Sequence, residues 1–294
     1  MQTTEASTAR DAFSFPLAAI EREAIVRAAL EEDRAYNDVT TLALVSAGLR
    51  ARAVLVARSA GVIAGLPLID TAFRLLDPAV TLRALAHDGA QVSTNEPVLE
   101  IEGHARALLS GERVALNFVQ RLSGIATLTA RFVDAIRGTR ARILDTRKTT
   151  PGLRALERYA VRCGGGTNHR DDLAAAVLIK DNHLEAIGSD VSLAVRRARV
   201  SAPEGTQIEV ECDRRDQVAA ALAAKPDVIL LDNMSCDEMR ACVALVNGAA
   251  IVEASGGITL GNVRAVAETG VDWISIGALT HSAPSLDLGL DFEI

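Results

Sequence analysis

The second half of the chain repeats one unit, a short apolar run followed by an amphipathic stretch, and this repetition is the strongest constraint on the fold. The apolar runs are rich in Val, Ile and Leu, as strands buried on both faces are. They lie at 142–146, 176–180, 207–211, 228–232, 250–254 and 272–277. Alternating strands and helices form a parallel sheet with right-handed crossovers, and six units in series favour an incomplete α/β barrel.

The first half has a different pattern. Short strands are predicted after a helix near 17–34, and turn residues separate them, which is typical of an antiparallel sheet accompanied by helices. These strands lie at 51–58, 61–65, 81–89 and 97–103. A long helical stretch, 106–137, leads into the repeats, and we expect Ser123-Gly124 to interrupt it.

Composition excludes several classes of protein. The 294 residues carry a net charge of −7, which argues against a nucleic-acid partner, and no apolar stretch is long enough to cross a bilayer. The first residues have neither the basic start nor the apolar core of a secretion signal. The four cysteines show no CxxC spacing, so we expect neither a disulfide framework nor a zinc site. We therefore expect a cytoplasmic protein with no membrane partner.

The basic residues are unevenly distributed. Residues 131–180 contain eleven Lys and Arg against five Asp and Glu, a net charge of +6. The whole chain has 28 arginines but only three lysines, Lys148, Lys180 and Lys225. Lys225 lies in a loop, whereas the other two are candidates for positions that need a compact ammonium. The local excess is either a solvated helix face or a pocket for an anionic small molecule.

Charged residues follow five successive predicted strands. In a parallel barrel the active site lies at the carboxyl ends of the strands, so these charges converge on one mouth. They are Arg147 with Lys148, then Lys180, Glu211, Asp232 and Glu253. Arg and Lys suit carboxylates and phosphates, while Glu211 and Asp232 could hold Mg²⁺ through water or accept ribose hydroxyls.

Two kinds of glycine-rich segment add to this site. Three glycines precede Asn168, His169 and Arg170, which predicts an anion-binding loop. Late barrel loops often hold a phosphate with backbone N–H groups, and here they contain Ser255, Gly256, Gly257 and Gly277. We interpret the remaining histidines outside these motifs as structural: His87, His104 and His281.

Six motifs, in this order along the chain, resemble those of the quinolinate phosphoribosyltransferases, the carboxylating nicotinate-nucleotide pyrophosphorylases. They are DTRKTTPGLR (145–154), GGGTNHR (164–170), LIKDNH (178–183), IEVEC (208–212), ILLDN (229–233) and VEASGGI (252–258). The resemblance implies an N-terminal α/β sandwich at 1–115, with the tail 283–294 returning to it, and an incomplete α/β barrel at 116–282. It also implies a pentosyltransferase that joins quinolinate to 5-phosphoribosyl 1-diphosphate with Mg²⁺, giving nicotinate mononucleotide, pyrophosphate and CO₂ for NAD biosynthesis.

The resemblance also assigns roles to residues. The residues that match those holding quinolinate are Arg147, His169, Arg170 and Lys180, together with Arg113 from the neighbouring subunit of a homodimer. Lys148, Glu211 and Asp232 match catalytic residues that contact the phosphoribosyl donor, the last two also its metal. Further substrate-binding matches are Thr149, Ser255, Gly256, Gly257 and Gly277.

Two positions differ from the family pattern, and three other functions stay open. Asp172 and Asn37 stand where relatives often have glycine. The alternatives are a paralogue that uses another acceptor acid, an aldolase with a Schiff base on Lys180, and a non-catalytic ligand-binding relic.

Overall fold

The computed structural model describes residues 14–293 of the chain, which divides into two compact units. The first unit comprises 1–130, 150–165 and 282–294, and the second comprises 131–149 and 166–281. The long helix α4 (Ala105–Ala135) contains the division between Ala130 and Arg131, whereas the sequence analysis predicts a boundary at 115/116.

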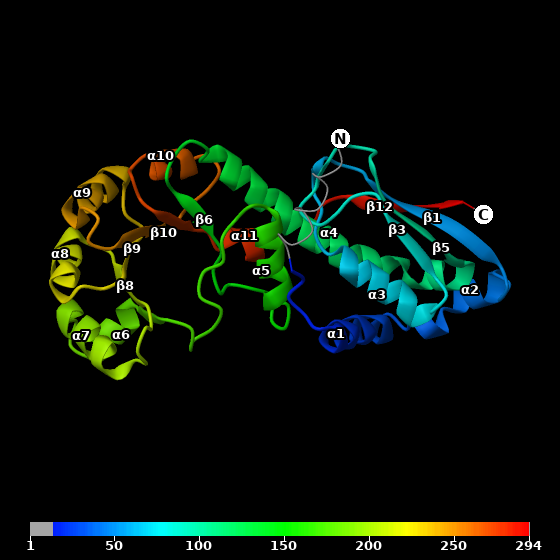
Figure 1. The fold of residues 1–294 in the computed structure, drawn as a ribbon, viewed down its shortest axis with the longest axis horizontal. Coiled ribbons are helices and arrows are strands. Elements are labelled where there is room, and N and C mark those ends of the chain that lie inside the picture. The colour runs from blue at the N-terminus through cyan, green and yellow to red at the C-terminus, as the bar shows by residue number, and fades with distance from the viewer. Residues whose placement is uncertain (1–13, 294) are drawn as a thin grey trace, which may run out of the picture. The chain divides into compact units, whose positions relative to one another are not determined.

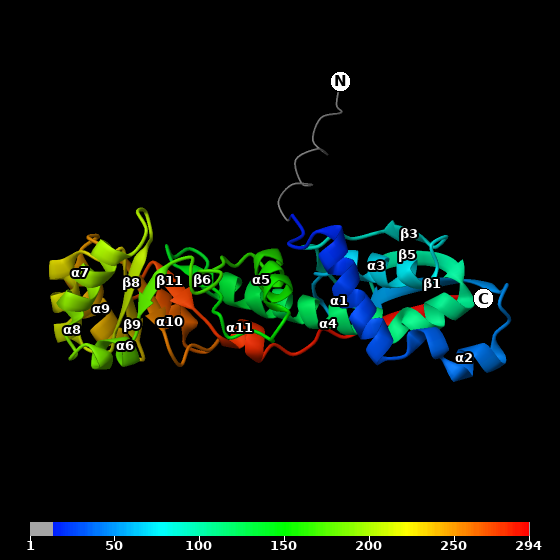
Figure 2. The same ribbon diagram turned by 90° about the horizontal axis from the view of Figure 1, so that it is seen from below.

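The first unit is built on a four-stranded antiparallel sheet in the order β12-β1-β5-β3 (Figures 1 and 2). Its strands are β1 (Arg50–Ala57), β3 (Thr81–Ala84), β5 (Pro97–His104) and β12 (Leu288–Glu293), and a separate pair is β2 (Gly61–Val62) with β4 (Gln91–Val92). Its helices are α1 (Ala19–Glu32), the 3₁₀ turn η1 (Ala35–Asn37), α2 (Val39–Leu44), α3 (Leu66–Leu76), most of α4, and α5 (Arg154–Cys163).

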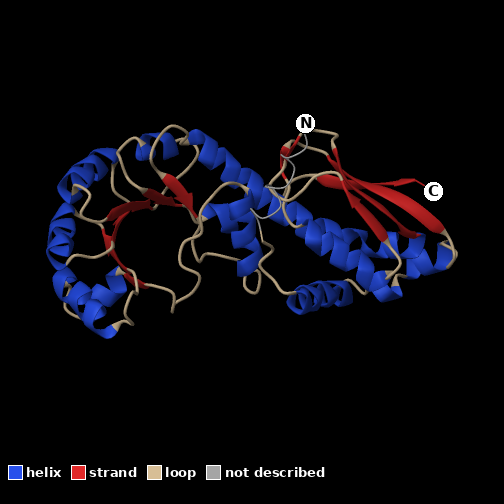
Figure 3. Cartoon of the chain, in the orientation of Figure 1, coloured by secondary structure: helices blue, strands red, loops and turns tan. Residues whose placement is uncertain are grey.

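One face of this sheet is covered by helices (Figure 3). Residues alternate between the two faces of a strand, and β1 accordingly buries Ala51, Ala53 and Leu55. Leu55 lines one small apolar space together with Phe73 of α3 and Leu116 of α4. The core of the unit therefore lies between the antiparallel sheet and these two helices.

The predicted interruption at Ser123-Gly124 is wrong, because α4 continues through both residues. The glycine instead permits a close approach: a Cβ at Gly124 would lie 2.1 Å from the carbonyl oxygen of Pro284. The hydroxyl of Ser123 accepts the backbone N–H of Ala64 at 2.9 Å. The Ser123-Gly124 pair, which resembles a helix breaker in the sequence, is thus the place where the segments around Ala64 and Pro284 pack on α4.

The C-terminal segment packs against α4 and then joins the sheet of the first unit. Leu286 donates its backbone N–H to the carbonyl of Gln120 at 2.9 Å, and the Gln120 side-chain amide donates to the carbonyl of Leu288 at 2.7 Å. Beyond this point β12 pairs with β1 in antiparallel register. The tail therefore supplies an edge strand of the first unit.

The second unit is a six-stranded parallel sheet in the order β6-β11-β10-β9-β8-β7. Its strands are β6 (Arg142–Leu144), β7 (Val177–Ile179), β8 (Ile208–Cys212), β9 (Val228–Asp232), β10 (Ile251–Ser255) and β11 (Trp273–Ser275). Its helices are α6 (Asp181–Ala186), α7 (Val191–Ser201), α8 (Arg215–Ala224), α9 (Cys236–Val246), α10 (Val263–Ala267) and α11 (Ala278–His281).

The strands of this unit follow an arc with helices on its outer side (Figure 3). All six apolar runs of the sequence form its strands, and β6 and β7 are its two edges. The predicted fold class, an antiparallel sheet with helices plus an incomplete parallel α/β barrel, is confirmed. All four cysteines are free, and none of the helices in the described range is long and apolar enough to cross a bilayer.

Candidate active site

A cavity of about 750 Å³ opens at the carboxyl ends of the parallel strands, wholly within the second unit. Most of the residues predicted from the sequence lie in its wall. They are Arg147, Lys148, His169, Arg170, Lys180, Glu211, Asp232, Ser255, Gly256, Gly257 and Gly277. Positions spread over 131 residues of sequence are therefore brought to one place by the strand order.

Two predicted site residues are not among the lining residues. Arg113 lies on α4 in the first unit, where its side chain is exposed. Thr149 follows Lys148 in the loop after β6, and its backbone N–H donates to the carbonyl of Arg147 at 3.0 Å. This hydrogen bond closes a tight turn, so Thr149 helps to set the backbone conformation of the loop.

Asp145, at the end of β6, is a residue that the sequence analysis did not single out. It is fully buried, and its carboxylate accepts the backbone N–H of His169 at 2.8 Å and the side-chain amide of Asn168 at 2.5 Å. Asp145 thereby fixes the glycine-rich loop 164–170 beside the end of β6. Its position before Arg147 in the DTRKT motif is the feature that could have identified it.

Two arginines come together in the cavity. Burial lowers the pKa of Arg170, and the nearby positive charge of Arg147 lowers it further. One Arg170 nitrogen donates to the carbonyl of Ala176 at 2.8 Å, while the Nε of Arg147 is buried without a hydrogen-bond partner within residues 14–293. Two guanidinium groups in one cavity, one of them with an unpaired buried donor, form a site that an anion would stabilise.

His169 contacts a pair of buried carboxylates. Its Nε2 lies 3.2 Å from an oxygen of Glu209 and 3.3 Å from an oxygen of Glu253, and both glutamates are almost fully buried. Burial alone would lower the pKa of His169, but its close contacts with the two negatively charged glutamates outweigh burial and raise that pKa to about 10. Burial raises the pKa of Glu209.

A second contact of His169 favours the neutral ring. The backbone N–H of Arg170 points at Nδ1 from 2.8 Å, and an imidazolium cannot accept that hydrogen bond. A neutral hydrogen bond contributes about 1 kcal/mol, whereas two opposite charges 4 Å apart gain about 4 kcal/mol at a dielectric constant of 20. The carboxylate pair is the larger effect, so we predict that His169 is an imidazolium.

Glu211 and Asp232, the carboxylates predicted to face the donor and its metal, each have one hydrogen-bond donor beside them. Glu211 accepts from the Lys180 ammonium at 2.9 Å, and Asp232 accepts from the side-chain amide of Asn233 at 2.7 Å. Within the described range, the only cluster of three groups close enough to share one metal ion is His169 with Glu209 and Glu253. Glu211 and Asp232 are not part of that cluster, so a cation bound by them would need further ligands from water or substrate oxygens.

The loop after β10 requires glycine at its centre. Gly256 has a φ of +87°, and a Cβ there would lie 2.2 Å from the side-chain oxygen of Asn233. Asn233 itself adopts a φ of +54° and donates its backbone N–H to the carbonyl of Ser255 at 2.9 Å. This backbone hydrogen bond joins the loops after β9 and β10 at the cavity wall.

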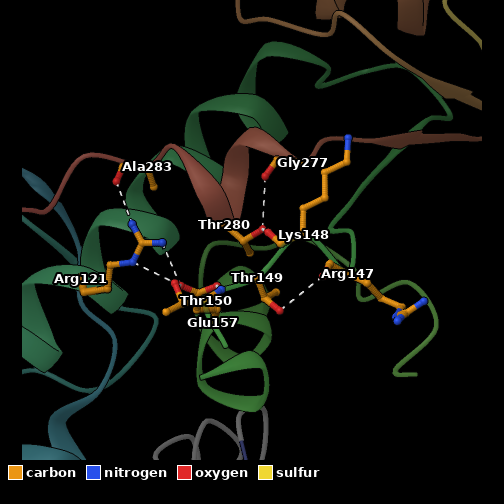
Figure 4. Close-up of polar contacts among 9 residues, drawn as sticks. All are labelled: Arg121, Arg147, Lys148, Thr149, Thr150, Glu157, Gly277, Thr280 and Ala283. Atoms are coloured by element: carbon orange, nitrogen blue, oxygen red, sulfur yellow. Dashed lines mark hydrogen bonds and ion pairs between the residues drawn. The ribbon is translucent and has the colours of Figure 1, made fainter. Parts of the chain in front are cut away.

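The loop after β6 continues into the first unit through Thr150 (Figure 4). The fully buried Glu157 accepts the Thr150 hydroxyl at 2.8 Å and the Arg121 guanidinium at 2.8 Å. Arg121 also donates to the carbonyl of Ala283 at 3.1 Å. Thr150 is thus anchored on α4, α5 and the C-terminal segment of that unit.

Three further findings revise the sequence interpretation. His281, interpreted as structural, lines the cavity. Asn37 is not among the residues with positive φ, so its replacement of glycine needs no left-handed backbone. Asp172 accepts the backbone N–H groups of Ala174 and Ala175 at 2.8 and 2.9 Å, which gives it a role in the turn after Arg170.

Comparisons with known proteins agree over nearly the whole chain. Residues 38–123 match the N-terminal domain of quinolinate phosphoribosyl transferase, and residues 125–291 match its C-terminal domain. The chain is 47% identical over 275 residues to the carboxylating nicotinate-nucleotide pyrophosphorylase of Mycobacterium leprae, covering 90% of this chain and 95% of that protein. It is 45% identical to the probable enzyme of that name in Bacillus subtilis, covering 90% of each.

Solved structures give the same result. The crystal structure of NadC from Streptococcus pyogenes superposes with a TM-score of 0.90 at 42% identity, covering 96% of this chain and all of that one. The nicotinate-nucleotide pyrophosphorylase of Francisella tularensis superposes with a TM-score of 0.88 at 35% identity, covering 95% and 98%.

Proposed function

Because the chain belongs to the quinolinate phosphoribosyl transferase family, we propose that it transfers a phosphoribosyl group from 5-phosphoribosyl 1-diphosphate to quinolinate. The products are nicotinate mononucleotide, pyrophosphate and CO₂. The observation that carries this proposal is the presence of two guanidinium groups, Arg147 and Arg170, in the same cavity as the two carboxylates Glu211 and Asp232. A dicarboxylate acceptor and a polyanionic, metal-dependent donor need both kinds of group.

The acceptor end of the cavity is the cationic one. Arg147, His169, Arg170 and Lys180 would hold the two carboxylates of quinolinate, and charge-assisted hydrogen bonds from guanidinium groups are the strongest available for this purpose. The unpartnered Nε of Arg147 supports this assignment because a bound carboxylate would satisfy it. The same anion would offset the repulsion between the positive charges of Arg147 and Arg170.

The donor end combines Lys148, the two carboxylates and the glycine loop at 255–257. In the reaction the bond from C1′ to the pyrophosphate oxygen breaks, its electron pair leaves with pyrophosphate, and the ring nitrogen forms the new bond to C1′. The bond to the 2-carboxylate then breaks, CO₂ leaves, and a proton from solvent replaces it. No step needs a protein nucleophile, so the chain mainly positions two anions, which can supply roughly 7–11 kcal/mol of a barrier.

We include Mg²⁺ in the proposal, held by Glu211 and Asp232 directly or through water. Hard carboxylate oxygens with open neighbouring positions suit this ion, which usually keeps several waters and binds substrate phosphates. When bound, the ion would neutralise charge on the departing pyrophosphate. The carboxylates of Glu211 and Asp232 also carry the right sign to stabilise positive charge at C1′.

We also propose a homodimer in a reducing cytosol. Arg113 is exposed on α4 and absent from the cavity wall, as expected for a residue that completes the site of another subunit. The partner subunit's Arg113 would then add a further cation to the acceptor end. The reducing cytosol is proposed from the sequence, whose four cysteines show no CxxC spacing.

The alternative of an aldolase is not favoured by Lys180. A Schiff-base lysine is typically desolvated in an apolar pocket or set next to another cation, whereas this side chain is 47% exposed and paired with Glu211. Incubating the protein with an aldehyde substrate and borohydride should therefore trap no covalent adduct.

One assay tests the proposed reaction directly. Purified protein is incubated with quinolinate, phosphoribosyl diphosphate and Mg²⁺, and both CO₂ and nicotinate mononucleotide are measured, with nicotinate as the control acceptor. We expect product from quinolinate and none from nicotinate, because the cation cluster is matched to two carboxylates. Folded protein that binds the donor but makes no product from either acid would overturn the proposal in favour of a paralogue with another acceptor.

A further inference from the structure

The loop that carries Arg147 and Lys148 has no regular secondary structure, yet Lys148 is fixed at its backbone. The carbonyl of Lys148 accepts the hydroxyl of Thr280 at 2.8 Å, and its backbone N–H donates to the Thr146 hydroxyl at 3.2 Å. Thr280 is fully buried in α11, the short helix that follows β11 (Figure 4). A buried hydroxyl from one strand-end loop therefore holds the main chain of another, within the second unit.

The hydroxyl of Thr280 makes an unusual choice of acceptor. Threonine in a helix ordinarily donates to a carbonyl three or four residues earlier, here that of Gly277 at 3.2 Å. The carbonyl of Lys148 is closer, and a hydroxyl has one proton to donate. The local helical contact is thus secondary to the contact between the two loops.

The side chain of Lys148 is supported by the same segment. A Cβ at Gly277 would lie 3.0 Å from Cδ of Lys148, so the lysine stem passes directly over the glycine. Figure 4 shows the ammonium at the end of the side chain farthest from Thr280. Within residues 14–293 this ammonium has no ion-pair partner, and it lines the cavity. Thr280 therefore fixes the backbone of Lys148, and Gly277 leaves room for its side chain.

We propose that Thr280 is a positioning residue for Lys148: its hydroxyl holds the loop after β6 so that the ammonium faces the phosphoribosyl donor. The inference rests on the proposed function only in the identity of the donor as 5-phosphoribosyl 1-diphosphate. Removing the hydroxyl frees the Lys148 carbonyl and lets the ammonium shift. A misplacement of a reacting group by ~1 Å can cost about 10²-fold in rate. A shift of the Lys148 ammonium by a fraction of that distance would therefore lower the rate measurably.

The test compares two substitutions at Thr280. Thr280→Val keeps the shape and removes the hydroxyl, whereas Thr280→Ser keeps the hydroxyl. We expect Thr280→Val to lower kcat and the affinity for phosphoribosyl diphosphate with Mg²⁺ by about tenfold. The affinity for quinolinate should fall less, because Arg147 on the same loop is only one of four cations at the acceptor end. Thr280→Ser should stay within about twofold of wild type. Calorimetric titration of each substrate gives the affinities.

A matched control separates positioning from stability. Thr269 is also buried in the second unit, and its hydroxyl donates to the carbonyl of Val266 at 2.6 Å, the same local pattern without a second loop. Thr269→Val should lower the melting temperature as Thr280→Val does, without changing donor affinity. Equal donor affinity in the two valine variants would overturn the proposal, as would an equal loss in Thr280→Ser.

The proposed function can fail independently of this inference. Wild-type protein that binds the donor but makes no product from quinolinate would overturn the function, while the donor affinities of the variants would still decide the role of Thr280. Wild-type protein that binds no phosphoribosyl diphosphate would overturn both.

Discussion

At the scale of single residues, His169 provides the sharpest test of the electrostatics. Its pKa is raised to about 10 from an ordinary 6.5 by Glu209 and Glu253. Because the folded-state pKa is the higher one, the imidazolium contributes stability that is complete below about 6.5 and is lost as the pH rises through about 10. NMR titration of the His169 ring nitrogens should therefore show a midpoint close to the upper value.

Glu253→Gln provides the control for that titration, since the amide keeps the shape and removes one of the two negative charges. We expect the midpoint of His169 to fall by at least about one pH unit, which corresponds to about 1.4 kcal/mol. A wild-type midpoint near 6.5 would show instead that the Arg170 N–H at Nδ1 decides the protonation state, and that His169 is neutral at physiological pH.

The sequence identified site residues by charge and by position at strand ends, and it missed those that act through buried contacts. Lys180, Glu211 and Asp232 follow apolar runs directly, so strand order alone brings them to one cavity. Thr280 was missed because a fully buried polar residue has no pattern of its own in one sequence. Asp145 was missed although its place in the DTRKT motif, two residues before Arg147, could have identified it. Their partners are distant in sequence and become visible only in the fold.

At the scale of elements, the second unit was the easier to predict. Parallel strands buried on both faces are continuous apolar runs, and each predicted run is a strand. In the first unit β3 ends at Ala84, five residues before the predicted end at 89, and β12 was not predicted as a strand. Its partner β1 lies more than two hundred residues earlier, and local patterns contain no information on such pairings.

Gly124 tests the packing of the C-terminal segment on α4. Glycine to alanine inside a helix ordinarily stabilises it by about 1 kcal/mol. At Gly124 the new Cβ would meet the backbone oxygen of Pro284 at 2.1 Å, a rigid neighbour, and overpacking costs about 1–3 kcal/mol. We expect Gly124→Ala to lower the free energy of unfolding in urea titrations.

Gly48→Ala is the control for an added methyl group that meets no neighbour, since Gly48 lies in an open turn outside the helices. A Cβ at Gly48 meets nothing within 4 Å, so its effect should lie within about 0.5 kcal/mol of zero. A Gly124→Ala protein as stable as wild type would mean that the segment around Pro284 yields at little cost and does not hold α4 as described.

At the scale of the whole molecule, the proposed homodimer predicts complementation between two inactive variants. Arg113→Ala should remove a cation from the partner's site, and Lys148→Ala should disable only its own site. If the two variants are unfolded and refolded together, half of the dimers are mixed, and each mixed dimer contains one intact site of two. We therefore expect the mixture to recover about a quarter of wild-type activity, although each variant alone is nearly inactive.

If Arg113 instead served the site of its own chain, each mixed dimer would contain one site lacking Arg113 and one lacking Lys148, so no activity would return. Size-exclusion chromatography with light scattering on each variant and on the mixture would establish that all three are dimers.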